Sequence, residues 1–181
     1  MKRQRVRLAA LGALCVLVAL VVFLSTRSVQ QGATSVDSPL LGEAAPTVVA
    51  STLEGGHVAL DALRGRVIVL SFFASWCPPC NQEAPDLAAF AWHEHVAHAT
   101  TELLGVVYDD EDVAAASFVH RYGLTYPILV DPSGAIANEF AVTAPPVTVV
   151  LTRSLHIEAV LEGPVTTSQL EALTAQAGRA T

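Results

Sequence analysis

Residues 67–73 read VIVLSFF, and the motif WCPPC follows at residues 76–80. An uninterrupted run of β-forming residues is typical of a strand that is covered on both faces. Pro79 suits the first turn of a helix, where its missing N–H leaves no hydrogen bond unmade. The chain therefore predicts a buried strand that leads into a helix, with two cysteines at the junction.

The segments around this junction alternate between strand-like and helix-like patterns. We expect strands over 47–50, 57–60, 103–108, 127–130, 147–151 and 156–161, and helices over 78–98, 112–122, 133–140 and 166–177. The first two strands flank Gly55-Gly56 and are expected to form a short hairpin. Strands that alternate with helices predict an α/β fold, in which helices cover both faces of the sheet.

The first 27 residues carry a separate signal. Residues 8–24 are a run of 17 apolar or small residues without charge. As a helix this run is about 26 Å long, the low end of what spans a bilayer. Four basic residues precede it, so the positive-inside rule places the N-terminus in the cytoplasm and the rest of the chain outside. Because no A-x-A-like site follows, we expect an uncleaved signal-anchor over 1–27, with cleaved export as the alternative.

Residues 28–43 are small and polar without periodicity, and they predict a flexible tether to a domain over 44–181. Charged residues make up only 15% of the chain and hydrophobic residues 52%, which excludes an intrinsically disordered protein. From Leu8 onward there are six basic and 17 acidic residues, a formal charge of −11. A surface this acidic does not follow phosphate backbones, so we expect no nucleic-acid partner.

Cys77 and Cys80 stand two residues apart at a helix start. The positive end of the helix dipole and its free N–H groups stabilise a thiolate, which raises the nucleophilic fraction of a thiol at neutral pH. The spacing lets the pair close into a disulfide and reopen. We therefore expect a redox pair. A purely structural disulfide is the weaker alternative, because the ring is tight and lies at a helix start.

The pattern Cys77-x2-Cys80-x12-His93-x4-His98 also fits the spacing of a C2H2 zinc finger. No lysine or arginine occurs over residues 67–120 to hold DNA, and the cysteines follow a buried strand rather than sit in a hairpin. We therefore predict no metal site, and we expect the histidines on the solvated face of the helix.

Four consecutive acidic residues occupy 109–112, before the helix expected over 112–122. They lack the alternating ligand spacing and the glycine of a calcium loop. Acidic residues are favoured at a helix N-terminus by the dipole, so we expect them to cap this helix.

Several segments match one known group at fixed positions. They are the redox motif at 75–80, Glu83, Pro85, the sequence GLTYPILVD at 123–131 and the sequence PVTVV at 146–150. In these the chain resembles the thioredoxin-like superfamily, and within it the membrane-tethered TlpA/ResA/CcmG branch, over residues 43–177. The resemblance implies a thioredoxin fold, with a central mixed sheet, helices on both faces and an extra N-terminal β-hairpin, behind the N-terminal transmembrane helix.

The resemblance also implies roles for the redox residues. Cys77 would be the exposed thiolate that attacks a substrate disulfide, and Cys80 would resolve the mixed disulfide. Cytoplasmic thioredoxins carry a buried aspartate where this chain has Ser71. Glu83, one helical turn beyond Cys80, is therefore the candidate for moving the proton of Cys80. The alternative for Glu83 is an ordinary solvated helix residue.

Three further residues are implied to bind substrate. Trp76 and Pro146, whose peptide bond is cis in the family, would shape the surface around the cysteines. Pro145 stands where the family offers its backbone to the substrate, and a proline keeps the C=O but has no N–H. We expect one main-chain hydrogen bond to substrate fewer than in relatives. No bound cofactor is implied, since the electrons reside in the cysteines.

The function expected from the resemblance is an extracytoplasmic protein-disulfide reductase, recharged by a membrane thiol-transfer protein. Its implied substrate is the CxxCH pair of apocytochrome c before haem attachment. The alternative is an oxidase that forms disulfides in exported proteins. A peroxiredoxin would need proline and threonine or serine where this chain has Leu70 and Ala74. A copper chaperone would need cysteines spaced by three residues, so a binding-only role is the poorest fit.

Overall fold

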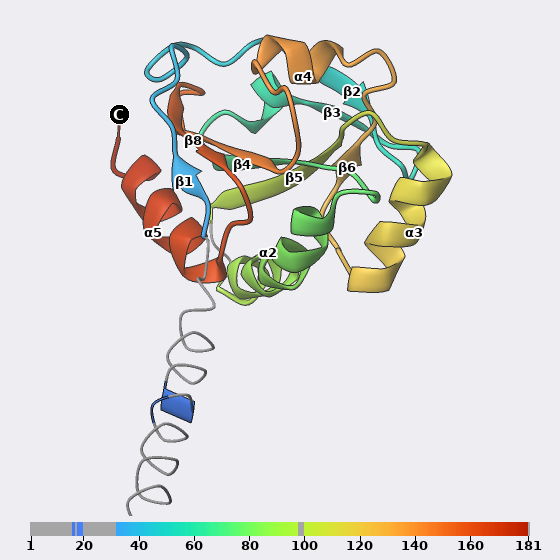
Figure 1. Cartoon of the computed structure of the whole chain (residues 1–181). Helices are drawn as coiled ribbons and strands as arrows, with labels where there is room; N and C mark the ends of the chain where they lie inside the picture. Colours follow the sequence, from blue (N-terminus) through green and yellow to red (C-terminus); the bar gives the residue numbers. More distant parts are fainter. Residues whose placement is uncertain (1–15, 17, 20–31, 98–99, 181) are drawn as a thin grey trace, which may run out of the picture. The chain divides into compact units, whose positions relative to one another are not determined.

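The computed structural model describes residues 32–97 and 100–180, together with Val16, Val18 and Ala19 (Figure 1). The signal-anchor expected over 1–27 thus lies outside the described residues, apart from those three. Within the part that is described, no helix has the length and apolar character needed to cross a membrane.

A six-stranded mixed sheet forms the centre of the domain, in the order β1-β8-β7-β4-β5-β6. The strands are β1 (Thr34–Ser35), β2 (Val49–Ser51), β3 (His57–Ala59), β4 (Val67–Phe73), β5 (Thr101–Val107), β6 (Ile128–Leu129), β7 (Val147–Leu151) and β8 (Ile157–Glu162). Strands β4, β5 and β6 run parallel, whereas β7 is antiparallel to β4 and β8 to β7. The hairpin β2–β3 forms a separate two-stranded sheet, as the glycine pair predicts.

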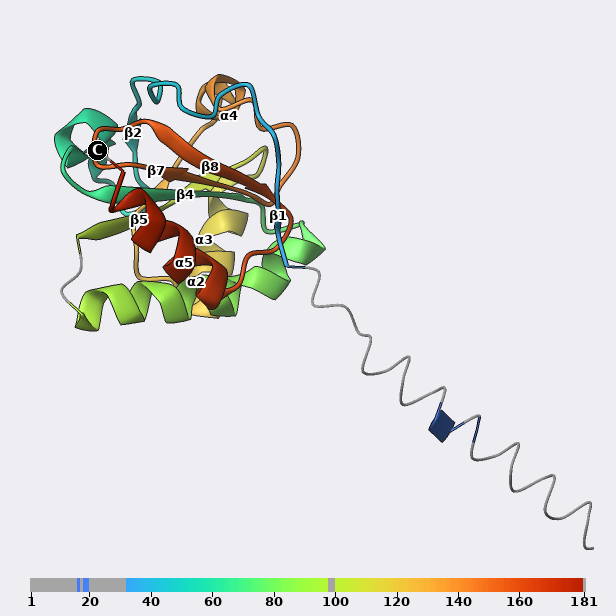
Figure 2. The same cartoon turned by 90° about the vertical axis from the view of Figure 1, so that its left-hand side faces the viewer.

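Helices cover both faces of the sheet. They are α2 (Pro78–Val96), α3 (Asp112–Tyr122), α4 (Ala135–Glu139) and α5 (Thr167–Ala177), with a 3₁₀ turn over Leu60–Leu63. Figures 1 and 2 show α2, α3 and α5 on one side of the sheet and α4 on the other.

The central strand β4 explains why both faces are covered. Its seven residues are all buried, as the run VIVLSFF predicts. Val69 and Phe73 belong to the core under α2, α3 and α5, whereas Leu70 and Phe72 belong to the core that α4 closes. Because successive side chains of a strand point to opposite faces, an apolar strand like this one needs a layer on each side.

Residues 33–43 differ from the flexible tether that composition suggested. Thr34 and Ser35 pair with β8 as the edge strand β1, and the Gly42 amide donates to the Ile157 carbonyl at 2.8 Å. Ala33 is buried against the core. Edge pairing uses the main-chain groups that every residue carries, so a small polar sequence can form it without a hydrophobic pattern. Residues 28–31 lie outside the described part.

Candidate active site

The two cysteines lie where β4 passes into α2. Cys77 is the N-cap of α2 and has an extended backbone, and Pro78 and Pro79 occupy the first helical positions. A disulfide joins Cys77 and Cys80, and Cys77 Sγ also accepts a hydrogen bond from the Cys80 amide at 3.2 Å. Sulfur at Cys77 therefore sits at the positive end of a helix, where a thiolate is stabilised after reduction.

The disulfide is more enclosed than expected. Cys77 is 2% exposed and Cys80 is fully buried, so Cys77 is the only member of the pair with any access to solvent. Cys77 is therefore much less exposed than expected, although it is still the more exposed of the two cysteines. Part of the cover is the Pro145 carbonyl oxygen, which lies 3.6 Å from Cys77 Sγ.

The peptide bond between Pro145 and Pro146 is cis, as the resemblance implies. Pro146 is buried, and its carbonyl accepts a hydrogen bond from the Gly163 amide at 3.0 Å. The Pro145 carbonyl can accept from the Cys77 thiol once the disulfide is reduced. On this side of the sulfur the chain presents a main-chain acceptor and no main-chain donor, because a proline nitrogen carries no hydrogen.

We predict that Pro145→Val tightens the complex with substrate, because it restores a main-chain N–H beside Cys77. A hydrogen bond of this kind contributes about 1 kcal/mol, or roughly fivefold in affinity. The measurement is the resistance of a peptide mixed disulfide on Cys77 to glutathione, in a Cys80→Ser background. Equal or faster release from the Pro145→Val protein counts against the missing-donor idea.

Trp76 is held by the loop after β5. Its indole N–H donates to the Asp109 carbonyl at 2.9 Å, and the Ser75 amide donates to Asp110 Oδ2 at 2.6 Å. The acidic run lies at the start of α3, as expected: Glu111 is the N-cap and Asp112 is in the first turn, although the Glu111 side chain makes no capping hydrogen bond. Asp110 instead fixes the segment that enters the redox motif. Only the adjacency of β4 and β5 in the sheet could have revealed this contact.

Trp76, which directly precedes Cys77, remains 55% exposed, as a substrate-contacting aromatic residue would be. We predict that Trp76→Ala lowers kcat/KM for a protein disulfide by about tenfold, since exposed tryptophans often anchor interfaces. The chain offers a matched control in Trp92, its only other tryptophan, which is 65% exposed near the far end of α2. An equal effect of Trp92→Ala would remove the argument for Trp76.

Glu83 lies inside the protein, and the solvated alternative is excluded. It is 1% exposed, its Oε2 accepts a hydrogen bond from the Val165 amide at 3.1 Å, and its Oε1 lies 3.5 Å from the Ser71 hydroxyl. Burial raises the pKa of Glu83 to about 8, against the opposing effect of the bonds from Val165 and Ser71, and Asp86 adds a smaller rise. At neutral pH the carboxyl of the oxidised protein is therefore mostly protonated.

This arrangement can move a proton within the site. Glu83 follows Cys80 by one turn of α2, and both side chains are buried. A carboxyl with a pKa near neutrality can both take and return a proton, which is the property of a general base. The transfer between Glu83 and Cys80 stays a prediction.

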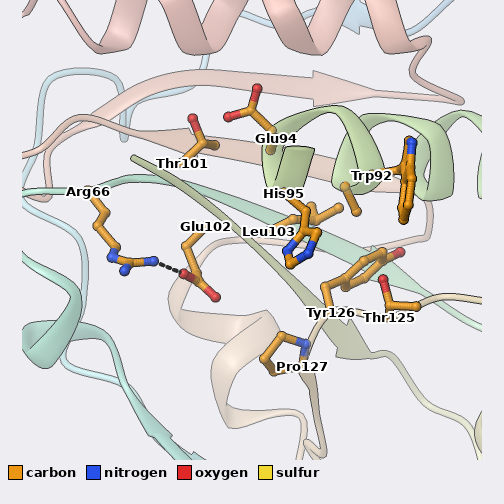
Figure 3. Close-up of a pocket in the computed structure, with 11 residues that line it drawn as sticks. Arg66, Trp92, Glu94, His95, Thr101, Glu102, Leu103, Thr125, Tyr126 and Pro127 are labelled. Atoms are coloured by element: carbon orange, nitrogen blue, oxygen red, sulfur yellow. Dashed lines mark hydrogen bonds and ion pairs between the residues drawn. The ribbon is translucent and has the colours of Figure 1, made fainter. Parts of the chain in front are cut away.

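A separate surface hollow of about 620 Å³ lies near the C-terminal end of α2, the opposite end from Cys77 (Figure 3). Trp92 and His95 line it, and Arg66 forms an ion pair with Glu102 at its side. Tyr126 also lines it, and the pKa of this buried tyrosine is held above its usual range by burial and then by the charge of Glu83. None of the residues predicted for the redox site lines this hollow.

Of the two histidines in the zinc-finger spacing, His93 is described, and its side-chain contact is with α5 and not with the cysteines. His93 is exposed, and its Nδ1 lies 3.0 Å from Glu171 Oε1. His98 falls outside the described residues. Over 32–97 and 100–180, no three histidine, cysteine or acidic side chains come together as a metal site.

Known proteins resemble this chain over most of its length. Residues 41–160, which contain all the predicted site residues, match the AhpC/TSA family. A thiol-disulfide oxidoreductase ResA from Bacillus thuringiensis is 28% identical over 131 residues, which cover 72% of this chain and 75% of that protein.

Solved structures of disulfide oxidoreductases also match this chain over most of its length. A secreted Mycobacterium tuberculosis disulfide oxidoreductase, homologous to E. coli DsbE, matches with a TM-score of 0.64 and 27% identity over 72% of this chain and 96% of its own. StoA from Bacillus subtilis matches with a TM-score of 0.63 and 26% identity over 75% and 99%. With this thioredoxin-like fold and the disulfide-forming pair Cys77–Cys80, the chain belongs to the AhpC/TSA family as a thiol-disulfide oxidoreductase.

Proposed function

We propose that this enzyme is a membrane-anchored, extracytoplasmic reductase of disulfides in exported proteins, with the CxxCH pair of apocytochrome c as its substrate. The observation that carries the proposal is the buried Glu83 one turn after Cys80, because it supplies a proton acceptor inside the site. Reduction of a substrate needs such a group at the step in which Cys80 becomes a nucleophile.

The reaction runs in two exchanges. The Cys77 thiolate attacks one sulfur of the substrate disulfide, and the other substrate sulfur leaves as a thiolate that takes a proton from water. Glu83 then accepts the proton of Cys80, and the new thiolate attacks Cys77 Sγ. The Cys77–Cys80 bond forms, the second substrate sulfur leaves as a thiolate that is protonated from water, and two electrons have passed to the substrate. In the oxidised enzyme Glu83 holds this proton at neutral pH, since the pKa of the carboxyl is about 8, and it returns the proton to Cys80 when the pair is reduced again.

The charges around the pair favour the reducing direction. A strongly oxidising pair is one whose reduced form is stabilised, which requires a stable Cys77 thiolate. Here the Asp110 carboxyl is bound to the Ser75 amide, two residues before Cys77. A carboxylate at this place opposes the stabilisation of the Cys77 thiolate by the helix N-terminus, and it thereby makes the dithiol a better reductant.

The N-terminal sequence supports the location of the proposed enzyme. The 17-residue apolar run over 8–24, preceded by four basic residues, supports a single membrane span with the catalytic domain outside the cytoplasm. A membrane thiol-transfer protein would then return electrons to the Cys77–Cys80 pair. Protease protection of intact cells, which should leave only the N-terminal residues shielded, tests this topology.

The direction of electron flow is tested with a peptide that carries CxxCH. The reduced full-length enzyme should convert the oxidised peptide to the dithiol faster than the oxidised enzyme converts the dithiol to the disulfide. The reverse order of rates would make the protein an oxidase of exported proteins.

A further inference from the structure

The turn between β8 and α5 touches the redox site at two points. Its Val165 amide donates to Glu83 Oε2 at 3.1 Å, and its Gly163 amide donates to the Pro146 carbonyl at 3.0 Å. One three-residue turn thus contacts both the buried acid and Pro146, the residue after the proline whose carbonyl lies beside Cys77. Any element that fixes this turn also fixes those two groups.

The edge strand β1, together with Ala33 directly before it, is such an element. The Ala33 amide donates to the Pro164 carbonyl at 2.8 Å, in the middle of the turn. Gln169, in the first turn of α5, donates from its side-chain amide to the Ala33 carbonyl at 3.0 Å. Gly163 has a φ of +92°, and a side chain there would meet the Ala33 backbone at 3.7 Å. Figures 1 and 2 both show the blue β1 beside the red chain that leads into α5.

We propose that β1 is a positioning element of the redox site, which holds the turn 163–165 in place so that its amides keep their contacts with Glu83 and Pro146. A domain boundary at residue 44, as composition suggests, would leave out β1, although β1 then supports the redox site. The inference rests on the proposed proton-transfer role of Glu83. The experiment below measures the pKa of the Glu83 carboxyl and not the rate of disulfide exchange.

The groups around Glu83 determine in which direction its pKa should move when the turn is loosened. The Val165 N–H and the Ser71 hydroxyl stabilise its carboxylate and lower the pKa, whereas burial and Asp86 raise it. Tyr126 faces it from the chain before β6, and Cys80 precedes it in α2. Loosening the turn weakens the Val165 bond, so the pKa of Glu83 must rise further above its usual range.

The experiment compares two variants of the oxidised full-length chain. Ala33→Pro removes the N–H that binds Pro164, and the control Ala45→Pro removes the N–H that binds the Leu155 carbonyl at 2.7 Å. Leu155 lies before β8, at the end of this strand that is away from the turn. The two variants are matched, because each replaces an alanine by a proline and removes one main-chain hydrogen bond. Difference infrared titration follows the Glu83 carboxyl, whose band is identified by its absence in Glu83→Gln.

We expect the titration midpoint to move upward from about 8 by on the order of one pH unit in Ala33→Pro, and to stay in place in Ala45→Pro. If Ala33→Pro fails to fold, Gln169→Leu, which removes the other contact to Ala33, should give a smaller rise. An unchanged midpoint in the folded variants, or equal rises in Ala33→Pro and Ala45→Pro, overturns the inference. Failure of the proton-transfer role appears separately, as an unchanged pH profile of exchange in Glu83→Gln.

Discussion

Replacement of Cys77 by serine is expected to lower the rate of disulfide exchange by on the order of 10³-fold or more. Cys77 is the cysteine at the helix N-terminus and the only one of the pair with any exposure, so it is the sulfur that a substrate can reach. A serine hydroxyl in its place has no ionised fraction at neutral pH and does not form a sulfur–sulfur bond. The measurement is reduction of an oxidised protein substrate by the reduced enzyme under steady-state conditions.

Replacement of Cys80 by serine has a different expected outcome. The first exchange remains, so Cys80→Ser should accumulate a covalent mixed disulfide between Cys77 and the substrate, visible on a non-reducing gel. Cys15→Ser is the matched control, because Cys15 lies in the apolar N-terminal run and should leave both exchanges unchanged. A mixed disulfide that forms on Cys80 in Cys77→Ser at the wild-type rate would reverse the assigned roles.

Glu83→Gln is expected to change how the stability of the oxidised protein depends on pH. The pKa of Glu83 is raised by burial from 4.5 to about 8, so the folded state holds a proton that the unfolded state loses. The free energy of unfolding of the wild type therefore falls as pH rises above 4.5, and the fall levels off above about 8. Between these two pH values the wild type should lose about 5 kcal/mol of its free energy of unfolding. Glu83→Gln should not show this loss, because glutamine does not titrate.

Urea unfolding at pH 5, 7 and 9 measures this dependence. Glu139→Gln is a suitable control, since Glu139 ends α4 on the surface and its loss should leave the slope of the wild type intact. A slope in Glu83→Gln as steep as that of the wild type would mean that the carboxyl is not held neutral inside the fold.

Much of the fold was predictable from local pattern. Strands β4 and β7 and helix α3 have the predicted bounds, because continuous apolar runs and a glycine after the helix mark their ends in the sequence. The hairpin β2–β3 forms around its glycine pair as expected. Strand β1 could not be predicted, since its two exposed residues join the sheet through main-chain groups alone.

The site was predictable in its residues but not in its surroundings. The positions of the cysteines and of the cis proline follow from their motifs. The burial of Glu83 depends on Val165, which is 82 positions later in the chain, and the support of Ser75 depends on Asp110, 35 positions later. Contacts of this kind come from the order of strands in the sheet, which local patterns do not contain.

The reduction potential of the Cys77–Cys80 pair tests the central claim most directly. It is obtained by equilibrating the full-length chain at pH 7 against dithiothreitol and glutathione buffers and quantifying the free thiols. A reductase of exported proteins requires a value near that of thioredoxin, about −270 mV. A value near that of DsbA, about −120 mV, would contradict the account and make the protein an oxidant of exported proteins.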